Sequence, residues 1–303
     1  MFNFKETLHS SMTSAWLVLK LIIPLYILAD LLLYYDVLKY IAFLFEPITD
    51  LLDLPKEAAL GIAAGMLFNI YAGIAFLAPL ELSAYQWTIL ATFLGVAHSL
   101  VVESAVMKKL GISYTYSFTL RIVVAFVAVI PILYMPKEFF EGSVVVGESI
   151  QKVVYSDVSE LLKNSFFNAT MLSLKVIVLI TVIIFLMAYL KSTKMMQKYQ
   201  EKVNTSFSIM AGLILGITYG AGILIHEVKS GSLSKVDIFY IATFLMICHS
   251  VIEDVLLFVI FGANGWAVIM IRLIMAFVFS YILLKIYAMI IDTKKEGKEN
   301  VSK

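Results

Sequence analysis

Two short segments place a histidine, a serine and acidic side chains inside stretches that are otherwise apolar. The residues are, in chain order, His98, Ser99, Glu103, His249, Ser250, Glu253 and Asp254. Ionisable groups at membrane depth are expensive and usually face a cavity or a partner. A histidine beside a carboxylate can relay protons, because imidazole titrates near neutral pH, and the same pair can hold a divalent cation. A structural hydrogen bond that fixes the two segments together is the alternative.

The spacing within each segment sets what it can do as a helix. His249 and Glu253 are four residues apart and share a helical face. His98 and Glu103 are five apart, so this pair meets well only if the helix is distorted. We expect the seven residues to bind substrate or an ion, and the identity of any metal is unknown from the sequence.

The two segments belong to an internal repeat with an offset of 151 residues. Between residues 91–127 and the residues that follow at this offset, 11 of 37 positions are identical. His98 falls on His249, Glu103 on Asp254, and the glycine pair 61 and 65 on 212 and 216. The repeat predicts two homologous halves, whose polar segments would converge on one pseudo-twofold axis.

Two arginines recur at the same offset, Arg121 and Arg272. Each follows the acid of its half, Glu103 or Asp254, by 18 residues across a turn that contains glycine. Snorkelling toward the membrane interface is one interpretation. Pairing with the two acids is the other, and it would make the arginines gating residues.

Asn69 lies within the apolar run 58–80, in an Asn-x-Tyr-x-Gly segment that ends at Gly73. Glycine and a polar side chain at bilayer depth favour a helix break, which is tolerated only beside protein or water. We expect Asn69 and the break to supply ligands for substrate or an ion. The matching segment of the second half is 219–222.

The composition indicates a membrane protein. Hydrophobic residues make up 61% of the 303 residues and charged residues 15%, against about half and a quarter in soluble domains. A bilayer span needs about 20 apolar residues. Eight apolar runs fit, at 15–35, 58–80, 87–107, 116–135, 169–190, 207–225, 238–261 and 266–291, with an amphipathic stretch at 37–54.

Several function classes are excluded by what the chain lacks. There is no GxxxxGK[ST] phosphate loop, so ATP-driven pumping by this chain alone is disfavoured. No GxSxG elbow supports a hydrolase, and we expect no enzyme activity, no catalytic residues and no cofactor. The net charge of +1 gives no indication of a nucleic-acid partner, and a single cysteine excludes an internal disulfide.

Basic residues predict the orientation of the two halves. They gather near residue 5, at 108–109, in the loop 191–202 and in the tail 292–303, and cytoplasmic loops are enriched in such residues. All four sites fall on one side if one run per half enters the membrane and returns. The fold class is then an all-α polytopic membrane protein of two inverted gate-like repeats with broken or re-entrant helices. The repeats would cover 1–135 and 166–291, joined by a polar connector, 136–165.

Residues 98–111, a His-Ser-x-x-x-acid segment ending in Lys-Lys-x-Gly, resemble the Gate or nucleoside-recognition domain, as does the run with Arg121. That domain occurs in ferrous-iron permeases, spore-maturation membrane proteins and concentrative nucleoside transporters. The resemblance implies paired gate domains of transporter type. It does not fix the substrate, because the Gly-x-Pro-Cys motif and G domain of the iron permeases are missing.

These observations predict a secondary transporter or permease for a small solute or ion. A divalent metal, a nucleoside-like compound and an organic anion remain open as substrates. A structural or assembly membrane protein without transport activity is the alternative. We expect the lipid bilayer as partner and the cytoplasmic membrane of a prokaryote as location, and self-association into a homo-oligomer is left open.

Overall fold

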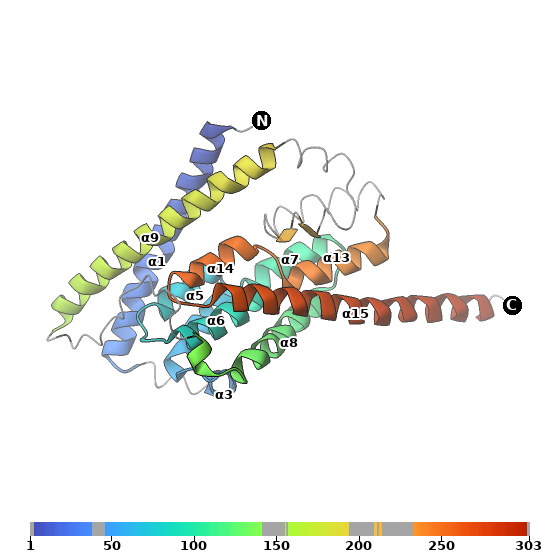
Figure 1. Cartoon of the computed structure of the whole chain (residues 1–303), viewed down its shortest axis with the longest axis horizontal. Helices are drawn as coiled ribbons and strands as arrows, with labels where there is room; N and C mark the ends of the chain where they lie inside the picture. Colours follow the sequence, from blue (N-terminus) through green and yellow to red (C-terminus); the bar gives the residue numbers. More distant parts are fainter. Residues whose placement is uncertain are drawn as a thin grey trace.

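A computed structural model describes residues 3–37, 46–140, 155, 157–193, 209–210, 212–213 and 233–301, and all regular structure in these ranges is helical. The elements are α1 (Phe4–Tyr34), α3 (Glu46–Leu51), η1 (Lys56–Ala58), α4 (Ala59–Leu67), α5 (Ile70–Leu77), α6 (Ala84–Ala97), α7 (Leu100–Lys109), α8 (Tyr114–Leu133), η2 (Lys137–Phe140), α9 (Val158–Ser192), α13 (Lys235–Ile247), α14 (Val251–Val259) and α15 (Gly265–Val301) (Figure 1).

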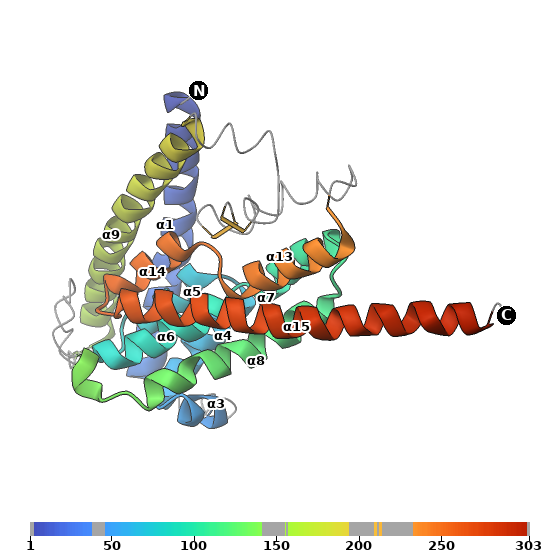
Figure 2. The same cartoon turned by 45° about the vertical axis from the view of Figure 1, so that its right-hand side comes forward.

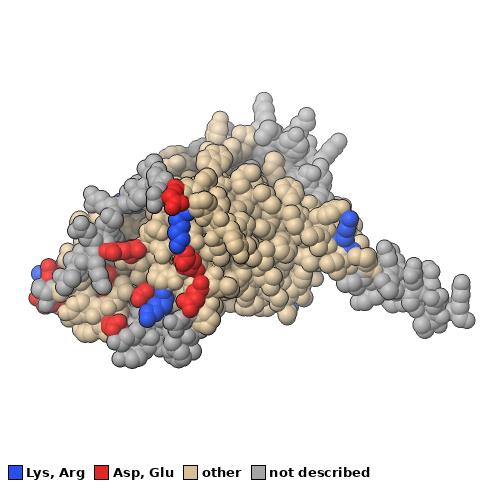
Figure 3. Space-filling model, turned by 60° about the horizontal axis from the view of Figure 1, so that its bottom comes forward, with Lys and Arg blue, Asp and Glu red and all other residues tan. Residues whose placement is uncertain are grey.

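Six stretches of the described chain are long and apolar enough to cross a bilayer. They are Phe4–Tyr34, Ala84–Lys109, Tyr114–Leu133, Val158–Leu190, Lys235–Val259 and Gly265–Met289. On the face drawn in Figure 3, most of the red and blue side chains gather toward one end, and a broad surface without them lies beside it. The chain is a polytopic all-α membrane protein, which confirms the predicted fold class at this level.

The first and fifth apolar runs form a long antiparallel pair, α1 and α9, which lies beside the other helices (Figures 1 and 2). Near one end of the pair the Ser11 hydroxyl donates to Thr181 at 2.8 Å, and near the other Ser165 donates to Asp30 at 2.5 Å. Asp30 and Ser165 are buried. These hydrogen bonds help to fix the register of the two helices.

The second apolar run forms a helical hairpin, α4 and α5, that is too short to cross. At about 1.5 Å per residue, nine and eight residues reach less than half of a hydrocarbon core of about 30 Å. The helices touch at backbone distance, since a Cβ on Gly73 would lie 3.0 Å from Gly65 Cα and 3.1 Å from Gly61 O. Asn69 occupies the tip, where its side chain accepts from Ala72 N–H at 3.0 Å.

The two spans at the centre of the molecule are discontinuous. The break between α6 and α7 falls at His98 and Ser99, and that between α13 and α14 at residues 248–250. Ser99 and Ser250 both adopt the left-handed conformation, with φ of 49° and 46°. Such a backbone costs about 1–2 kcal/mol outside glycine, so the surrounding structure must hold it. The distortion that the five-residue spacing of His98 and Glu103 requires is therefore present.

The helix boundaries of the two halves repeat at the offset seen in the sequence. Helices α6, α7 and α8 begin 151 residues before α13, α14 and α15. Capping boxes at Ser83 and Ser234 start the first helix of each set. Gly111 and Gly262, with φ of 85° and 99°, turn the chain before the last. Only glycine takes this conformation without strain.

The predicted match of Gly61 with Gly212 is wrong. Ser99 N–H donates to Gly65 O at 3.0 Å, and the corresponding Ser250 N–H meets Gly212 O at 3.5 Å. A Cβ on Gly65 would clash with Leu94, and one on Gly212 with the equivalent leucine of α13. Gly212 therefore takes the place of Gly65, and the two halves differ by four residues between this glycine and the break. The segment 219–222 and Gly216 lie outside the described residues.

We expect Gly73→Val to lower the melting temperature of the purified protein in detergent by several degrees. The added side chain would push α4 and α5 apart, and overpacking of this kind costs about 1–3 kcal/mol. Leu67→Ala is the control, because Leu67 lies on the same hairpin and is half exposed. Equal melting temperatures for the Gly73 variant and the unchanged protein would contradict the close packing of the hairpin.

Candidate functional site

Arg121 of α8 closes the broken end of α6. Its Nε donates to Val96 O and its Nη2 to His98 O, both at 2.7 Å. His98 Nδ1 contacts Leu94 O at 2.8 Å. Carbonyl groups left free at a helix end inside a membrane have no water to bind. Arg121 and the His98 ring supply the hydrogen-bond donors that water would otherwise provide.

The second half repeats this arrangement with small differences. Arg272 Nη2 donates to His249 O at 2.9 Å, and His249 Nδ1 contacts Leu245 O at 2.7 Å. The guanidinium also contacts Asp254 Oδ2 at 3.3 Å. Its Nε, however, has no hydrogen-bond acceptor among the described residues. The break of α13 is therefore less fully satisfied than that of α6.

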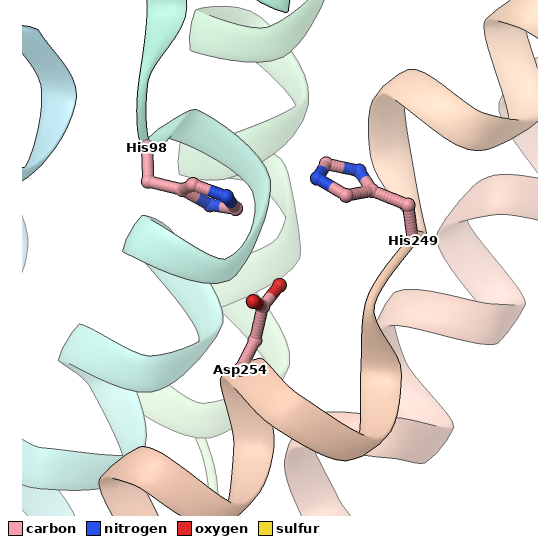
Figure 4. A group of neighbouring side chains, drawn as sticks. All are labelled: His98, His249 and Asp254. Carbon is pink, nitrogen blue, oxygen red and sulfur yellow. The ribbon is translucent and has the colours of Figure 1, made fainter. Parts of the chain in front are cut away.

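Glu103 of α7 joins the two halves at the centre of the cluster. Its Oε1 lies 3.1 Å from His98 Nε2, and its Oε2 lies 2.7 Å from Arg121 Nη1 and 3.4 Å from His249 Nε2. The two contacts of Oε2 have ion-pair distances without the alignment of hydrogen bonds. The imidazole rings face each other with centroids 5.3 Å apart, and the Asp254 carboxylate points toward them from α14 (Figure 4).

These six groups lie almost entirely out of contact with solvent or lipid. Their exposed fractions are 0% for both arginines, 1% for His249, 5% for Asp254, 6% for His98 and 7% for Glu103. With neutral imidazoles, the two guanidinium charges balance the two carboxylate charges. Removing one member of a buried ion pair leaves an uncompensated charge, at a cost of about 3–5 kcal/mol.

His98, His249 and Asp254 offer a nitrogen or oxygen each within 4.8 Å of one another. One carboxylate oxygen of Asp254 is already paired with Arg272. Two guanidinium groups in the same cluster also oppose a further cation. The described geometry therefore fits a metal ion poorly.

The structure brings together most of the residues singled out from the sequence. His98, Glu103, His249, Asp254, Arg121 and Arg272 form the cluster. Both arginines are buried and paired with the acids of their own halves, rather than extended toward the membrane interface. Ser99 and Ser250 shape the breaks through their backbones.

Two predicted residues take other positions. Glu253 does not share a helical face with His249, because the chain is broken between them, and its Oε1 accepts from the Tyr71 hydroxyl at 2.7 Å. Asn69 caps α5, and none of its contacts within the described chain reaches the cluster. The expected contribution of Asn69 to binding stays a prediction.

Two residues of the cluster's surroundings were missed in the sequence. Tyr71 links the hairpin to α14 across 182 residues, and Gly95 leaves room for Arg272, whose Nη1 would lie 3.1 Å from a Cβ there. The Asn-x-Tyr segment marked Tyr71 as polar at membrane depth. Its partner lies in the other half, so no spacing along the chain could identify it.

The helices and the buried cluster define a class: a polytopic α-helical membrane protein with two discontinuous central spans and an ionisable centre at their breaks. The chain is 31% identical over 280 residues to the uncharacterized membrane protein YvoD of Bacillus subtilis (strain 168), covering 89% of this chain and 90% of that protein. The chain belongs to the family of this Bacillus protein. No protein-family model and no solved structure matches it.

We expect Arg121→Met to destabilise the protein by about 3–5 kcal/mol, because it leaves the Glu103 carboxylate and two backbone carbonyls without their donor. Thermal unfolding in detergent measures the loss. Lys108→Met is the control, since Lys108 is an exposed cation one helix away. Adding Glu103→Gln to Arg121→Met should recover part of the loss. Equal melting temperatures for Arg121→Met and the control would rule out the capping role.

Proposed function

We propose that this protein is a secondary transporter that moves a small solute or ion across the bilayer. The observation that carries the proposal is the pair of facing helix breaks, each lined by a histidine, an acid and an arginine. Discontinuous spans form binding sites near the bilayer midplane in secondary transporters. Ionisable groups within membrane segments commonly mark substrate or ion pathways and proton relays.

The relative direction of the halves supports an inverted repeat. The Trp87 ring stacks on Phe261 beyond the end of α14, with centroids 4.5 Å apart, whereas His98 at the other end of α6 faces His249 at the start of α14. The two central spans therefore run antiparallel. Helices α8 and α15 also run in opposite directions in Figures 1 and 2.

The hairpin α4–α5 supports the same architecture, because it enters and returns without the length to cross. If each half contains one such element, all four basic sites lie on the same side of the membrane. The likeness to Gate domains rests on the segment 98–111 and the run with Arg121. The likeness favours a transporter and leaves divalent metals, nucleosides and organic anions as candidate substrates, with metals disfavoured by the two arginines.

The inverted topology predicts that single cysteines at positions 5, 109, 198 and 298 react from the same side of the membrane. Each is introduced by a Lys→Cys change into a variant whose buried Cys248 is replaced by Ala. Labelling of right-side-out and inverted vesicles with a membrane-impermeant maleimide measures the sidedness. Reaction of positions 198 and 298 from opposite sides would mean that the halves are parallel.

Transport predicts that His98→Ala and His249→Ala reduce flux while the protein still folds. We would first rank manganese, uridine and succinate by the thermal shift they produce, and then measure uptake of the best compound into proteoliposomes. Because the two rings act on one ligand, the double variant should lose much less than the product of the single losses. His9→Ala is the control, as His9 is exposed. Normal flux with additive losses of melting temperature would instead identify a membrane scaffold.

A further inference from the structure

The hydrogen-bond partners of the two histidines fix where their protons lie. A backbone carbonyl oxygen can only accept, so Nδ1 of His98 must donate to Leu94 O, and Nδ1 of His249 to Leu245 O. A neutral imidazole carries one N–H. Both rings, if neutral, would therefore turn the bare lone pair of Nε2 toward the cluster.

A lone pair at His98 Nε2 is incompatible with its surroundings. The nearest atom is Glu103 Oε1 at 3.1 Å, which is hydrogen-bond distance. An ionised carboxylate has only acceptor sites, and two acceptors at this distance repel each other. One proton must therefore occupy this contact, beyond those of neutral imidazoles and ionised acids. Arg121 holds the carboxylate at 2.7 Å, which favours the proton on the ring.

Among the described residues, several charged or titratable groups gather around the His98 ring and the acids near it. They are Glu103 of α7, Arg121 of α8, His249 of the second break, Glu253 and Asp254 of α14, Arg272 of α15 and Tyr71 of α5. Glu253 is the acid of this set that has no arginine partner among the described residues. The position that corresponds to it in the first half is Val102.

With all three acids ionised, the charges of this set balance when the extra proton is present. Two guanidinium groups and one imidazolium carry three positive charges, and Glu103, Asp254 and Glu253 carry three negative charges. Without the proton the set holds one net negative charge in apolar surroundings, where an uncompensated charge is expensive. Glu253 thereby carries the negative charge that balances the extra proton, although its own hydrogen bond comes from Tyr71.

From this geometry we infer that the cluster is a binding site for one proton, held between His98 Nε2 and Glu103. His249 Nε2 lies nearby, 3.4 Å from the Glu103 carboxylate. Coupling of solute movement to this proton rests on the transport function proposed above. Release of the proton would put the His98 lone pair against Glu103 and leave the set negatively charged. The break of α6 would then have to rearrange or take up another cation, and this links proton release to a change in the two central spans.

The protonation state is measured directly by nitrogen NMR of the full-length protein labelled with [15N]histidine in lipid nanodiscs. His9→Gln and His226→Gln leave only the two rings of the cluster, and His249→Gln assigns them. We expect one ring with both nitrogens protonated between about pH 6 and 8, and two neutral rings protonated at Nδ1 in the Glu103→Gln variant. Glu81→Gln, at an exposed loop position, should leave the spectrum unchanged.

Two neutral rings throughout this pH range in the otherwise unchanged cluster would overturn the inference, whether or not Glu103→Gln folds. Resonances that shift on adding zinc chloride and return with EDTA would overturn it in favour of a metal. The spectrum needs no substrate, so it stands apart from the flux test. In proteoliposomes, uptake driven by an imposed pH gradient supports the coupling, and uptake indifferent to the gradient overturns it.

Discussion

The structure depends on closing two interrupted helices inside a membrane. An interruption frees carbonyl groups that lipid cannot hydrate, and here arginines from the following helices donate to them. A guanidinium can reach several acceptors at once because its donors form a planar fork. Burying it requires a carboxylate nearby, which Glu103 and Asp254 provide. The acids, the arginines and the breaks are thus parts of one arrangement, and removing one member leaves the others without a partner.

The glycines place this arrangement against the rest of the molecule. Gly111 and Gly262 reverse the chain so that α8 and α15 return along the spans they follow. The Gly65 carbonyl oxygen accepts a hydrogen bond from Ser99 N–H. Because Gly65 has no side chain, it leaves room for Leu94. Gly65 also packs against Gly73, and this close approach holds the hairpin together. Movement at the first break would therefore strain the hairpin as well, because one glycine contacts both.

The sequence predicted the cluster better than it predicted the individual contacts. Repetition of costly residue types identified His98, His249, the acids and the arginines, since such groups rarely recur by chance at membrane depth. The same method failed for Gly61, because matching by a constant offset cannot detect four residues gained or lost between elements. It also failed for Glu253, because helical spacing assumes an unbroken helix. Contacts between halves, such as that of Tyr71, depend on packing and leave no pattern along the chain.

The hydrogen bond from Tyr71 to Glu253 belongs to one half only, since Val102 stands where the first half would need the acid. In a carrier whose two halves exchange conformations, perfect symmetry would make the inward-open and outward-open states equal in free energy. A hydrogen bond to a charged group contributes about 1.5–3 kcal/mol. A contact present in one state and absent from its mirror image would then bias the resting population by about tenfold or more. In such a carrier, this asymmetry would decide which side of the membrane the unloaded site prefers to face.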